Sequence, residues 1–215
     1  MEIEFSLTHT RGSDMAYTVL TMFKTAADYR DDAISALKQM KEISLANGSQ
    51  GVRIGMMQSG SNVGNFVAIQ AYENMGKMEA VYDALHEAPI VKKAQGSGKF
   101  SVVRRGVMKV LTSFGVASAD DAKYVTLTFG IADDPAIEPI TKFADVLTKN
   151  GALGGRYGPL TIGDYAIGKT YLFGATYPST SAIESAYDAV AADGTAEELY
   201  KQVSVQRRQV IRLIG

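Results

Sequence analysis

One short stretch occurs twice in this chain, and this repeat limits the possible folds more than any other feature of the sequence. Residues 100–111 read FSVVRRGVMKVL, and residues 203–214 read VSVQRRQVIRLI. A serine, two adjacent arginines and a valine recur at the same spacing, so that Arg104 is matched by Arg207 (207 − 104 = 103 positions). A constant offset between matched residue types indicates a duplicated unit of about a hundred residues.

The same offset extends to earlier parts of the two copies. Arg53 matches Arg156 without a gap (156 − 53 = 103), and an Asn-Gly pair precedes each of them. We therefore divide the 215-residue chain into a first repeat at residues 1–111, a linker at residues 112–121 and a second repeat at residues 122–215. Matched residues are expected to occupy equivalent positions in the two folded repeats.

Hydrophobic patterning predicts the order strand, helix, strand, strand, helix, strand in both repeats. Runs of β-branched and aromatic residues predict strands, and apolar residues at helical spacing predict helices. In the first repeat the predicted strands are residues 15–23, 50–58, 65–72 and 100–111, and the predicted helices are residues 28–46 and 75–86. In the second repeat, Asp134 is expected to cap the first helix, and Ser179 or Thr180 the second. The glycine-rich stretches GSNVGN and GALGGRYG are interpreted as turns.

This order of elements is the ferredoxin-like arrangement, in which both helices cover one face of a four-stranded antiparallel sheet. The other face must also be covered, and in a duplicated chain the sheet of the other repeat can cover it. We therefore predict an α+β fold, in which two ferredoxin-like βαββαβ repeats pack sheet to sheet as a pseudo-dimeric α+β barrel.

With these elements the chain resembles the dimeric α+β barrel superfamily, whose tandem fused members have this length. Residues 71–74, AYEN, and residues 85–89, LHEAP, are similar to the strand-to-helix segment of its antibiotic-biosynthesis-monooxygenase-like members. The resemblance implies a small organic ligand and an activity such as that of a cofactor-independent monooxygenase, isomerase or lyase acting on an aromatic or polyketide-like compound. No cofactor is expected, because the haem-binding relatives use a histidine in their C-terminal domain and residues 112–215 contain none.

Composition narrows the classes of partner. The 22 basic and 23 acidic residues give a net charge of −1, which provides no electrostatic reason to expect binding to nucleic acid or to a membrane surface. The absence of cysteine excludes disulfides and thiolate metal sites. No apolar run reaches membrane-spanning length, and the N-terminus has acidic residues where a signal peptide needs basic ones, so a cytoplasmic protein is expected. The sequence leaves open whether the protein forms a homodimer.

The alternation of side chains along a strand predicts which residues face the interior of the barrel. If the helices cover the face that carries Leu20, then Tyr17, Arg53, Gln70 and Tyr72 face the interior. A lining of aromatic side chains with few polar groups suits a flat organic ligand, and we assign Tyr17, Arg53 and Gln70 as candidate substrate-binding residues. The alternative is that these aromatic side chains only pack the core between the two sheets.

The adjacent arginines of the repeated stretch must point to opposite faces of their strand. Arg104 shares a face with Phe100 and Val102, which have the character of a core that faces the helices. Arg105 and Arg208 are then predicted to face the barrel interior. A buried guanidinium needs a carboxylate, a backbone carbonyl or a ligand anion as its partner, which makes Arg105 a candidate substrate-binding residue. The alternative is that the arginines form salt bridges near the strand ends and join the two repeats.

His86 ends the second predicted helix of the first repeat, where the second repeat has Ala191 (191 − 86 = 105). An imidazole can donate or accept a proton near neutral pH, so we assign His86 and Tyr72 as the candidate catalytic residues. The alternative interpretation of His86 is a cation that stabilises the C-terminus of a helix.

The two repeats differ where a ligand would bind. Ala68 and Gln70 of the first repeat are matched by Phe173 and Ala175 of the second. Larger aromatic side chains are therefore expected to fill the second repeat, and a single pocket is predicted on the sheet of the first. A different class of function stays open, namely a non-catalytic assembly or regulatory protein with a dry core between its sheets.

Overall fold

The computed structural model describes residues 16–116, 120–166 and 168–214. The first repeat contains β1 (Tyr17–Thr25), the 3-10 helix η1 (Ala27–Tyr29), α1 (Arg30–Ala46), β2 (Gly51–Met57), β3 (Phe66–Tyr72), α2 (Met75–Glu87), α3 (Pro89–Gly96) and β4 (Phe100–Lys109). The second repeat contains β6 (Tyr124–Ile131), α4 (Ile137–Lys149), β7 (Gly154–Ile162), β8 (Thr170–Tyr177), α5 (Thr180–Ala192), α6 (Thr195–Tyr200) and β9 (Ser204–Ile214). A further strand, β5 (Thr112–Gly115), follows the first repeat. The predicted βαββαβ order is confirmed, with a short extra helix, α3 or α6, before the last strand of each repeat.

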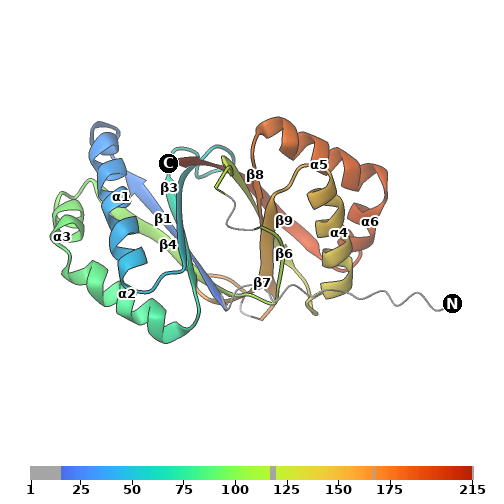
Figure 1. Cartoon of the computed structure of the whole chain (residues 1–215), viewed down its shortest axis with the longest axis horizontal. Coiled ribbons are helices and arrows are strands. Elements are labelled where there is room, and N and C mark those ends of the chain that lie inside the picture. The colour runs from blue at the N-terminus through green and yellow to red at the C-terminus, as the bar shows by residue number, and fades with distance from the viewer. Residues whose placement is uncertain (1–15, 117–119, 167, 215) are drawn as a thin grey trace.

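The strands form one sheet that closes on itself. Their order is β4-β1-β3-β2-β9-β6-β8-β7-β5, and β4 also pairs with β7. Each repeat therefore supplies four neighbouring strands, which the antiparallel pairs β2–β9 and β4–β7 join to the other repeat. Helices α1 to α3 cover one side and α4 to α6 the opposite side, with the two halves of the sheet facing each other between them (Figure 1). The structure is the predicted α+β fold of two ferredoxin-like repeats packed sheet to sheet.

Strand register shows that the matched residues are equivalent. Arg104 and Arg207 occupy the same place in the β1–β4 and β6–β9 pairs. Arg53 and Arg156 occupy the same place in the β2–β3 and β7–β8 pairs. The β1–β4 and β6–β9 pairs also carry a register irregularity at the same point, so the duplication extends to details of the backbone.

The predicted assignment of the two sheet faces was wrong for β1 and β3. Phe23 shares a core with residues of α1, and Val19 and Tyr72 pack with Val81 of α2. Leu20 instead belongs to the core between the two halves of the sheet. Both faces of these strands are apolar because both are covered. Alternation therefore separates two sets of residues without showing which set faces the helices.

A β-bulge decides which arginine of each pair faces the helices. The register places one extra residue, Val103, between Val102 and Arg104, whose partners on β1 are adjacent. The bulge shifts the alternation by one residue, so that Arg105 lies on the helix side together with Val102. The prediction that Arg105 and Arg208 face the barrel interior was therefore wrong.

Close packing of strands explains part of a glycine-rich stretch that was predicted to be a turn. The second half of GALGGRYG lies in β7. A Cβ atom at Gly158 would overlap the carbonyl oxygen of Lys109, and one at Gly154 would lie 2.5 Å from the backbone nitrogen of Val116. These glycines let the end of β4 and strand β5 approach β7. The predicted linker at residues 112–121 therefore begins with a strand.

One of the two predicted helix starts is confirmed. The side chain of Ser179 accepts a hydrogen bond from the backbone nitrogen of Ala182 at 3.1 Å and caps α5. Asp134 does not cap α4, because that helix begins later, after Ala136, which has a left-handed backbone with a φ of 49°.

Candidate functional site

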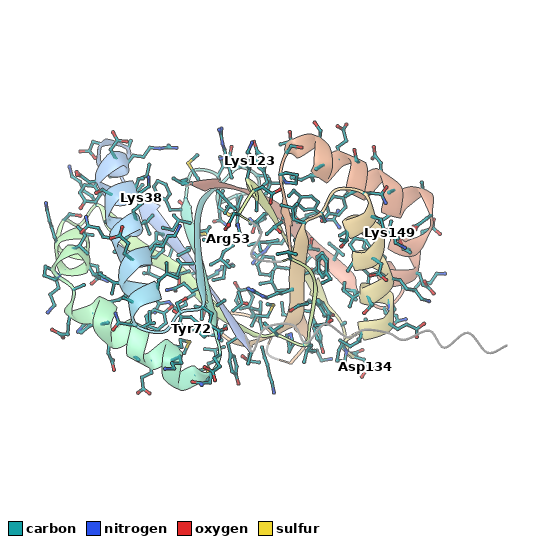
Figure 2. The ribbon with its side chains drawn as sticks, viewed as in Figure 1. Lys38, Arg53, Tyr72, Lys123, Asp134 and Lys149 are labelled. Atoms are coloured by element: carbon teal, nitrogen blue, oxygen red, sulfur yellow. The ribbon has the colours of Figure 1, made fainter. Side chains whose placement is uncertain are left out.

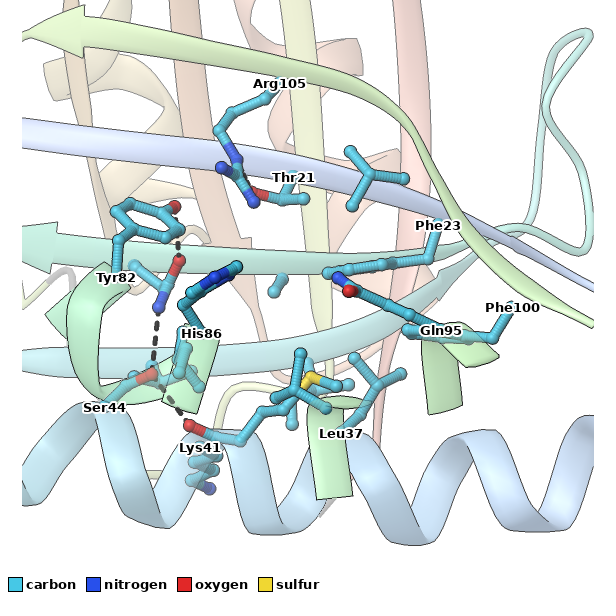
Figure 3. Close-up of a pocket in the computed structure, with 18 of the residues that line it drawn as sticks. Thr21, Phe23, Leu37, Lys41, Ser44, Tyr82, His86, Gln95, Phe100 and Arg105 are labelled. Atoms are coloured by element: carbon cyan, nitrogen blue, oxygen red, sulfur yellow. Dashed lines mark hydrogen bonds between the residues drawn. The ribbon is translucent and has the colours of Figure 1, made fainter. Parts of the chain in front are cut away.

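A cavity of about 360 Å³ lies between the first half of the sheet and the helices α1, α2 and α3. We call it the helix-side pocket (Figure 3). Its walls are mainly apolar and include the stacked rings of Phe23 and Phe100, whose centroids are 4.9 Å apart. A volume and a lining of this kind are typical of sites for small organic molecules.

A chain of hydrogen bonds crosses one wall of the helix-side pocket. The Tyr82 hydroxyl donates to Gln70 Oε1 at 3.1 Å, and Gln70 Nε2 donates to Ser44 Oγ at 3.0 Å. Ser44 Oγ in turn donates to the carbonyl oxygen of Met40 at 2.7 Å. These bonds fix the direction of the buried Gln70 amide. Because an amide has two donor and two acceptor positions, Gln70 can still bond a polar group of a ligand.

Arg105 is held against Tyr82. Its guanidinium carbon lies 4.3 Å from the centre of the Tyr82 ring, and its Nε donates to Thr21 Oγ1 at 3.1 Å. Within the described residues no carboxylate lies within salt-bridge distance of Arg105. Since Arg105 lines the helix-side pocket, its terminal nitrogens are available to bind a carboxylate, phenolate or carbonyl oxygen there.

His86 lies in the last turn of α2 and lines the same pocket. Figure 3 shows its imidazole pointing into the space between Tyr82 and Gln95. The helix-side pocket thus combines a group that can take a proton with an arginine that can stabilise the resulting anion.

The second repeat keeps the arginine, threonine and tyrosine of this arrangement, but its pocket is filled. Arg208 donates to Thr128 Oγ1 at 3.1 Å and lies 4.1 Å from the centre of the Tyr187 ring. At the register position that Ala68 occupies in the first repeat, however, the second repeat has Phe173. The cavity there measures about 20 Å³, so side chains occupy the space that is open in the first repeat.

A second cavity, of about 550 Å³, lies inside the barrel between the two halves of the sheet. We call it the inter-sheet cavity. Arg53 and Arg156, which are equivalent in the two repeats, both line it, and Figure 2 shows Arg53 between the two halves. The region between the sheets is therefore not packed solidly throughout, as a dry core would require.

Burial lowers the pKa of both Arg53 and Arg156. The positive charge of Arg53 lowers the pKa of Arg156 further, whereas the carboxylates of Asp120 and Asp121 raise the pKa of Arg53. Because a guanidinium group is not deprotonated in proteins, both arginines stay charged at neutral pH.

The residues predicted to form one site fall in three places. Gln70, His86 and Arg105 line the helix-side pocket, Arg53 lines the inter-sheet cavity, and Tyr17 and Tyr72 belong to an apolar cluster against α2. Burial raises the pKa of Tyr72, so its hydroxyl keeps its proton at neutral pH. The structure does not bring Tyr72 to the lining of the pocket that holds His86.

Ser44 and Tyr82 were not predicted as site residues, although the sequence pattern distinguishes both of them. Ser44 falls on the apolar stripe of α1, seven residues after Leu37, where a buried polar residue needs a hydrogen-bond partner. Tyr82 recurs as Tyr187, and each of these tyrosines lies under the equivalent arginine. A polar residue on a buried stripe and an aromatic residue that recurs in both repeats are therefore the sequence features that could have predicted Ser44 and Tyr82 as site residues.

Among the described residues, no group of three or more His, Cys, Asp or Glu side chains could hold a metal ion. The second repeat contains no histidine, and its equivalent of the helix-side pocket, at about 20 Å³, leaves no room for a porphyrin. In the part of the chain that the structure describes, no helix is long and apolar enough to cross a membrane.

A protein family matches both repeats. The profile of the family described as Domain of unknown function (DUF6854) matches residues 15–110 and again residues 122–213. A search of curated proteins found no match.

Solved structures share the fold over nearly the whole chain. Two proteins described as "putative monooxygenase", from Fusobacterium nucleatum and Lactobacillus acidophilus, have TM-scores of 0.69 and 0.62 at 12% and 14% identity. The likeness covers 94% and 93% of this chain, respectively, and 93% of each of theirs. An "anthrone oxidase-like protein" has a TM-score of 0.53 at 13% identity, over 94% of this chain and 93% of its own. At these identities the likeness concerns the fold alone. The chain thus has the fold of an α+β barrel made of two fused repeats, and it belongs to the family described as Domain of unknown function (DUF6854).

Proposed function

We propose that the protein binds a small, flat and largely apolar organic molecule in the helix-side pocket. One observation carries this proposal: at the register position where the second repeat has Phe173, the first has Ala68 and a cavity of about 360 Å³. Empty space in a core costs stability, and the second repeat shows that the unit can hold a side chain that fills it. The open pocket is therefore better explained by binding than by packing.

The polar groups of the helix-side pocket indicate the chemistry of the ligand. Gln70, held by Tyr82, can bond a carbonyl or hydroxyl group. His86 can accept the proton of a phenol or an enol, and Arg105 can stabilise the charge left on the oxygen. The ligand that suits these groups is an aromatic or polyketide-like compound with an acidic C–H or O–H group.

The same groups favour reaction of the bound compound with O₂ without a cofactor. Loss of a proton gives a carbanion or phenolate, which can pass an electron to O₂ directly. For a methylene group between aromatic rings the balanced change is CH₂ + O₂ → C=O + H₂O, in which one oxygen atom enters the product and the other leaves as water. The descriptions "putative monooxygenase" and "anthrone oxidase-like protein" of similar folds support the choice of this reaction class.

Anthrone is a suitable probe, because it carries such a methylene group. The purified protein is titrated with anthrone under nitrogen, and binding is measured by the quenching of tyrosine fluorescence. Air is then admitted, and O₂ uptake and the absorbance of anthraquinone are followed against a protein-free control. The wild-type protein is expected to bind anthrone and to accelerate its oxidation.

Variants of the two repeats locate the site and separate binding from reaction. Ala68→Phe gives the first repeat the side chain that the second carries, and it is expected to abolish binding in a folded protein. Phe173→Leu is the matched control, with binding unchanged. His86→Gln is expected to keep binding and to slow oxidation about a hundredfold. Binding without oxidation by the wild-type protein would exclude the oxygenase, and unchanged binding by Ala68→Phe would exclude the pocket.

A further inference from the structure

The inter-sheet cavity carries an excess of positive charge that the whole chain does not. Its lining contains four cationic side chains and one carboxylate among the described residues, namely Lys41, Arg53, Lys123 and Arg156, and Asp120. The whole chain has a net charge of −1. A concave surface that gathers cations within a protein of balanced charge attracts anions.

Two of these cations enter the barrel from opposite halves of the sheet. Arg53 lies on β2 and Arg156 on β7, at equivalent places in the two repeats. Both have interactions within the protein, and they are close enough for the charge of Arg53 to lower the pKa of Arg156. An anion bound between two like charges in a partly buried space relieves their repulsion.

The rest of the lining distinguishes an organic anion from an inorganic one. Apolar side chains from both repeats form much of the wall, and they include Leu20, Ile69, Met108, Val125, Leu127 and Leu172. A volume of about 550 Å³ lies in the range of sites that hold drug-sized molecules. A carboxylate with an apolar body satisfies both parts of the lining, because guanidinium groups bind carboxylates with matched geometry and apolar walls favour burial of the body.

We infer that the inter-sheet cavity is a second binding site, for an apolar organic carboxylate whose charged group binds to Arg53 and Arg156. Both repeats build this site, whereas the lining of the helix-side pocket comes from the first repeat. Ile69 and Gln70 are neighbours on β3, yet the first lines the inter-sheet cavity and the second the helix-side pocket. Lys41, Val52 and Ile54 line both cavities, whereas Ala68 lines only the helix-side pocket and Gly174 only the inter-sheet cavity. Substitutions at Ala68 and Gly174 can therefore test the two sites separately.

Gly174 offers a way to fill the inter-sheet cavity while both arginines are kept. It lies opposite Arg156 in the β7–β8 pair and lines the cavity. The nearest atom to a Cβ at this position would be Leu127 Cδ2, at 3.5 Å, which is an ordinary contact. Gly174→Phe therefore directs a ring into the cavity without a clash at its Cβ.

Isothermal titration calorimetry with octanoate tests the inference. Octan-1-ol is the uncharged molecule of the same chain length, and inorganic phosphate is the anion without an apolar body. The wild-type protein is expected to bind one octanoate per chain, at least about tenfold more tightly than octanol or phosphate. Arg156→Met, which keeps much of the apolar stem, and Gly174→Phe are each expected to weaken octanoate binding by at least about tenfold.

Ala68→Phe closes the helix-side pocket and shows which cavity holds octanoate. Binding that persists in Ala68→Phe and falls in Gly174→Phe supports the inference. Binding that is lost in Ala68→Phe but kept in Gly174→Phe would overturn it, as would no binding by the wild-type protein or equal affinity for octanoate and octanol.

Circular dichroism checks that each variant is folded. If Arg156→Met does not fold, the octanoate affinity of Gly174→Phe tests the inference. The inference does not rest on the proposed function. Failure of anthrone oxidation and failure of octanoate binding are therefore separate results.

Discussion

At the scale of single residues, the two repeats share an arginine, a threonine and a tyrosine, and they differ in the side chains around these three. Arg105 and Arg208 make the same hydrogen bond to a threonine and lie over equivalent tyrosine rings. Ala68 and Phe173 occupy the same register position and leave cavities of about 360 and 20 Å³ respectively. Phe143 and Tyr157 also line the smaller cavity, at the positions of Met40 and Ile54 in the first repeat. In an interior packed as densely as a crystal, a few larger rings remove a pocket.

Two glycines of the second repeat are expected to respond in opposite ways to alanine. A Cβ at Gly174 would have its nearest contact at 3.5 Å, whereas one at Gly158 would overlap the carbonyl oxygen of Lys109. Gly174→Ala should therefore raise the free energy of unfolding by about 0.4–1 kcal/mol, because the unfolded chain loses freedom. Gly158→Ala should lower it by more than about 1 kcal/mol. Urea unfolding followed by circular dichroism measures both, and a destabilised Gly174→Ala would contradict the open space assigned to that position.

Buried tyrosines predict how stability depends on alkaline pH. Burial raises the pKa of Tyr72, Tyr157 and Tyr177 above the ordinary value of 10.0. Below that pH both states keep the protons. Above it the unfolded chain releases protons that the folded protein holds, so the free energy of unfolding falls as the pH rises.

We therefore expect the midpoint of urea unfolding to decline above about pH 10, and Tyr177→Phe to make this decline shallower. Tyr200→Phe is the control, because Tyr200 is 44% exposed. The same slope in the wild-type protein and in Tyr177→Phe would show that Tyr177 is not responsible.

At the scale of elements, one extra residue in β4 sets which side chain meets a ligand. The bulge at Val103 turns Arg105 to the helix side, where it lines the helix-side pocket. Arg104 then lies on the other face, with its guanidinium carbon 5.8 Å from the centre of the Tyr165 ring. The two adjacent arginines thus face different parts of the molecule, Arg105 the helix-side pocket and Arg104 the barrel interior.

This assignment predicts different effects of the same substitution at neighbouring positions. Arg105→Met is expected to weaken anthrone binding and to slow its oxidation by about tenfold, because the developing oxyanion loses its charged partner. Arg104→Met should leave both within about twofold, because its side chain faces the barrel. The fluorescence titration and the O₂ measurement check both variants. A larger effect of Arg104→Met would mean that the bulge is placed wrongly.

The helices and strands that could be predicted from the sequence are those whose structure depends mainly on their own residues. The apolar runs predicted at residues 50–58 and 65–72 form β2 and β3, because short apolar runs bounded by turn residues are typical of strands that are covered on both faces. Strand β5 was missed, because its four residues pair only where the glycines of β7 permit a close approach.

The candidate site was predictable only in part, for a related reason. Gln70, His86 and Arg105 do line one pocket, but it lies on the helix side of the sheet. Its side depends on sheet pairing and on a bulge, and both are set by contacts between segments distant in sequence. The pattern of residues within one segment does not predict such long-range contacts.

At the scale of the whole molecule, each repeat depends on the other to cover its sheet. The pairs β2–β9 and β4–β7 join the outer strands of the two repeats, and a shared apolar core lies between the two halves. A repeat on its own would expose two strand edges and a large apolar face, which favours association.

Separate expression of residues 1–111 and 112–215 tests this dependence. Each fragment alone is expected to form oligomers or to aggregate, and an equimolar mixture refolded from urea should give a one-to-one complex. Size-exclusion chromatography with light scattering measures the masses. Fragments that stay monomeric and folded, and that ignore each other on mixing, would contradict the prediction.

Haem is not expected in the protein, because the second repeat offers neither a histidine nor more than about 20 Å³ at the equivalent position. Protein expressed with added haem should show no Soret band in its absorption spectrum. A Soret band that disappears in His86→Ala would show that the first repeat holds haem instead.

The closed barrel formed by two fused repeats also bears on how such a chain can evolve. In a homodimer of one repeat, every substitution appears at two symmetric places, so a pocket opened in one subunit weakens both. Fusion removes this constraint. Phe173 packs edge-on against Phe143, with ring centroids 5.8 Å apart, in the half where the equivalent of the helix-side pocket is filled. The second repeat stabilises the barrel, so that destabilising mutations in the first repeat are tolerated. New ligand specificities can therefore arise in the first repeat without loss of the fold.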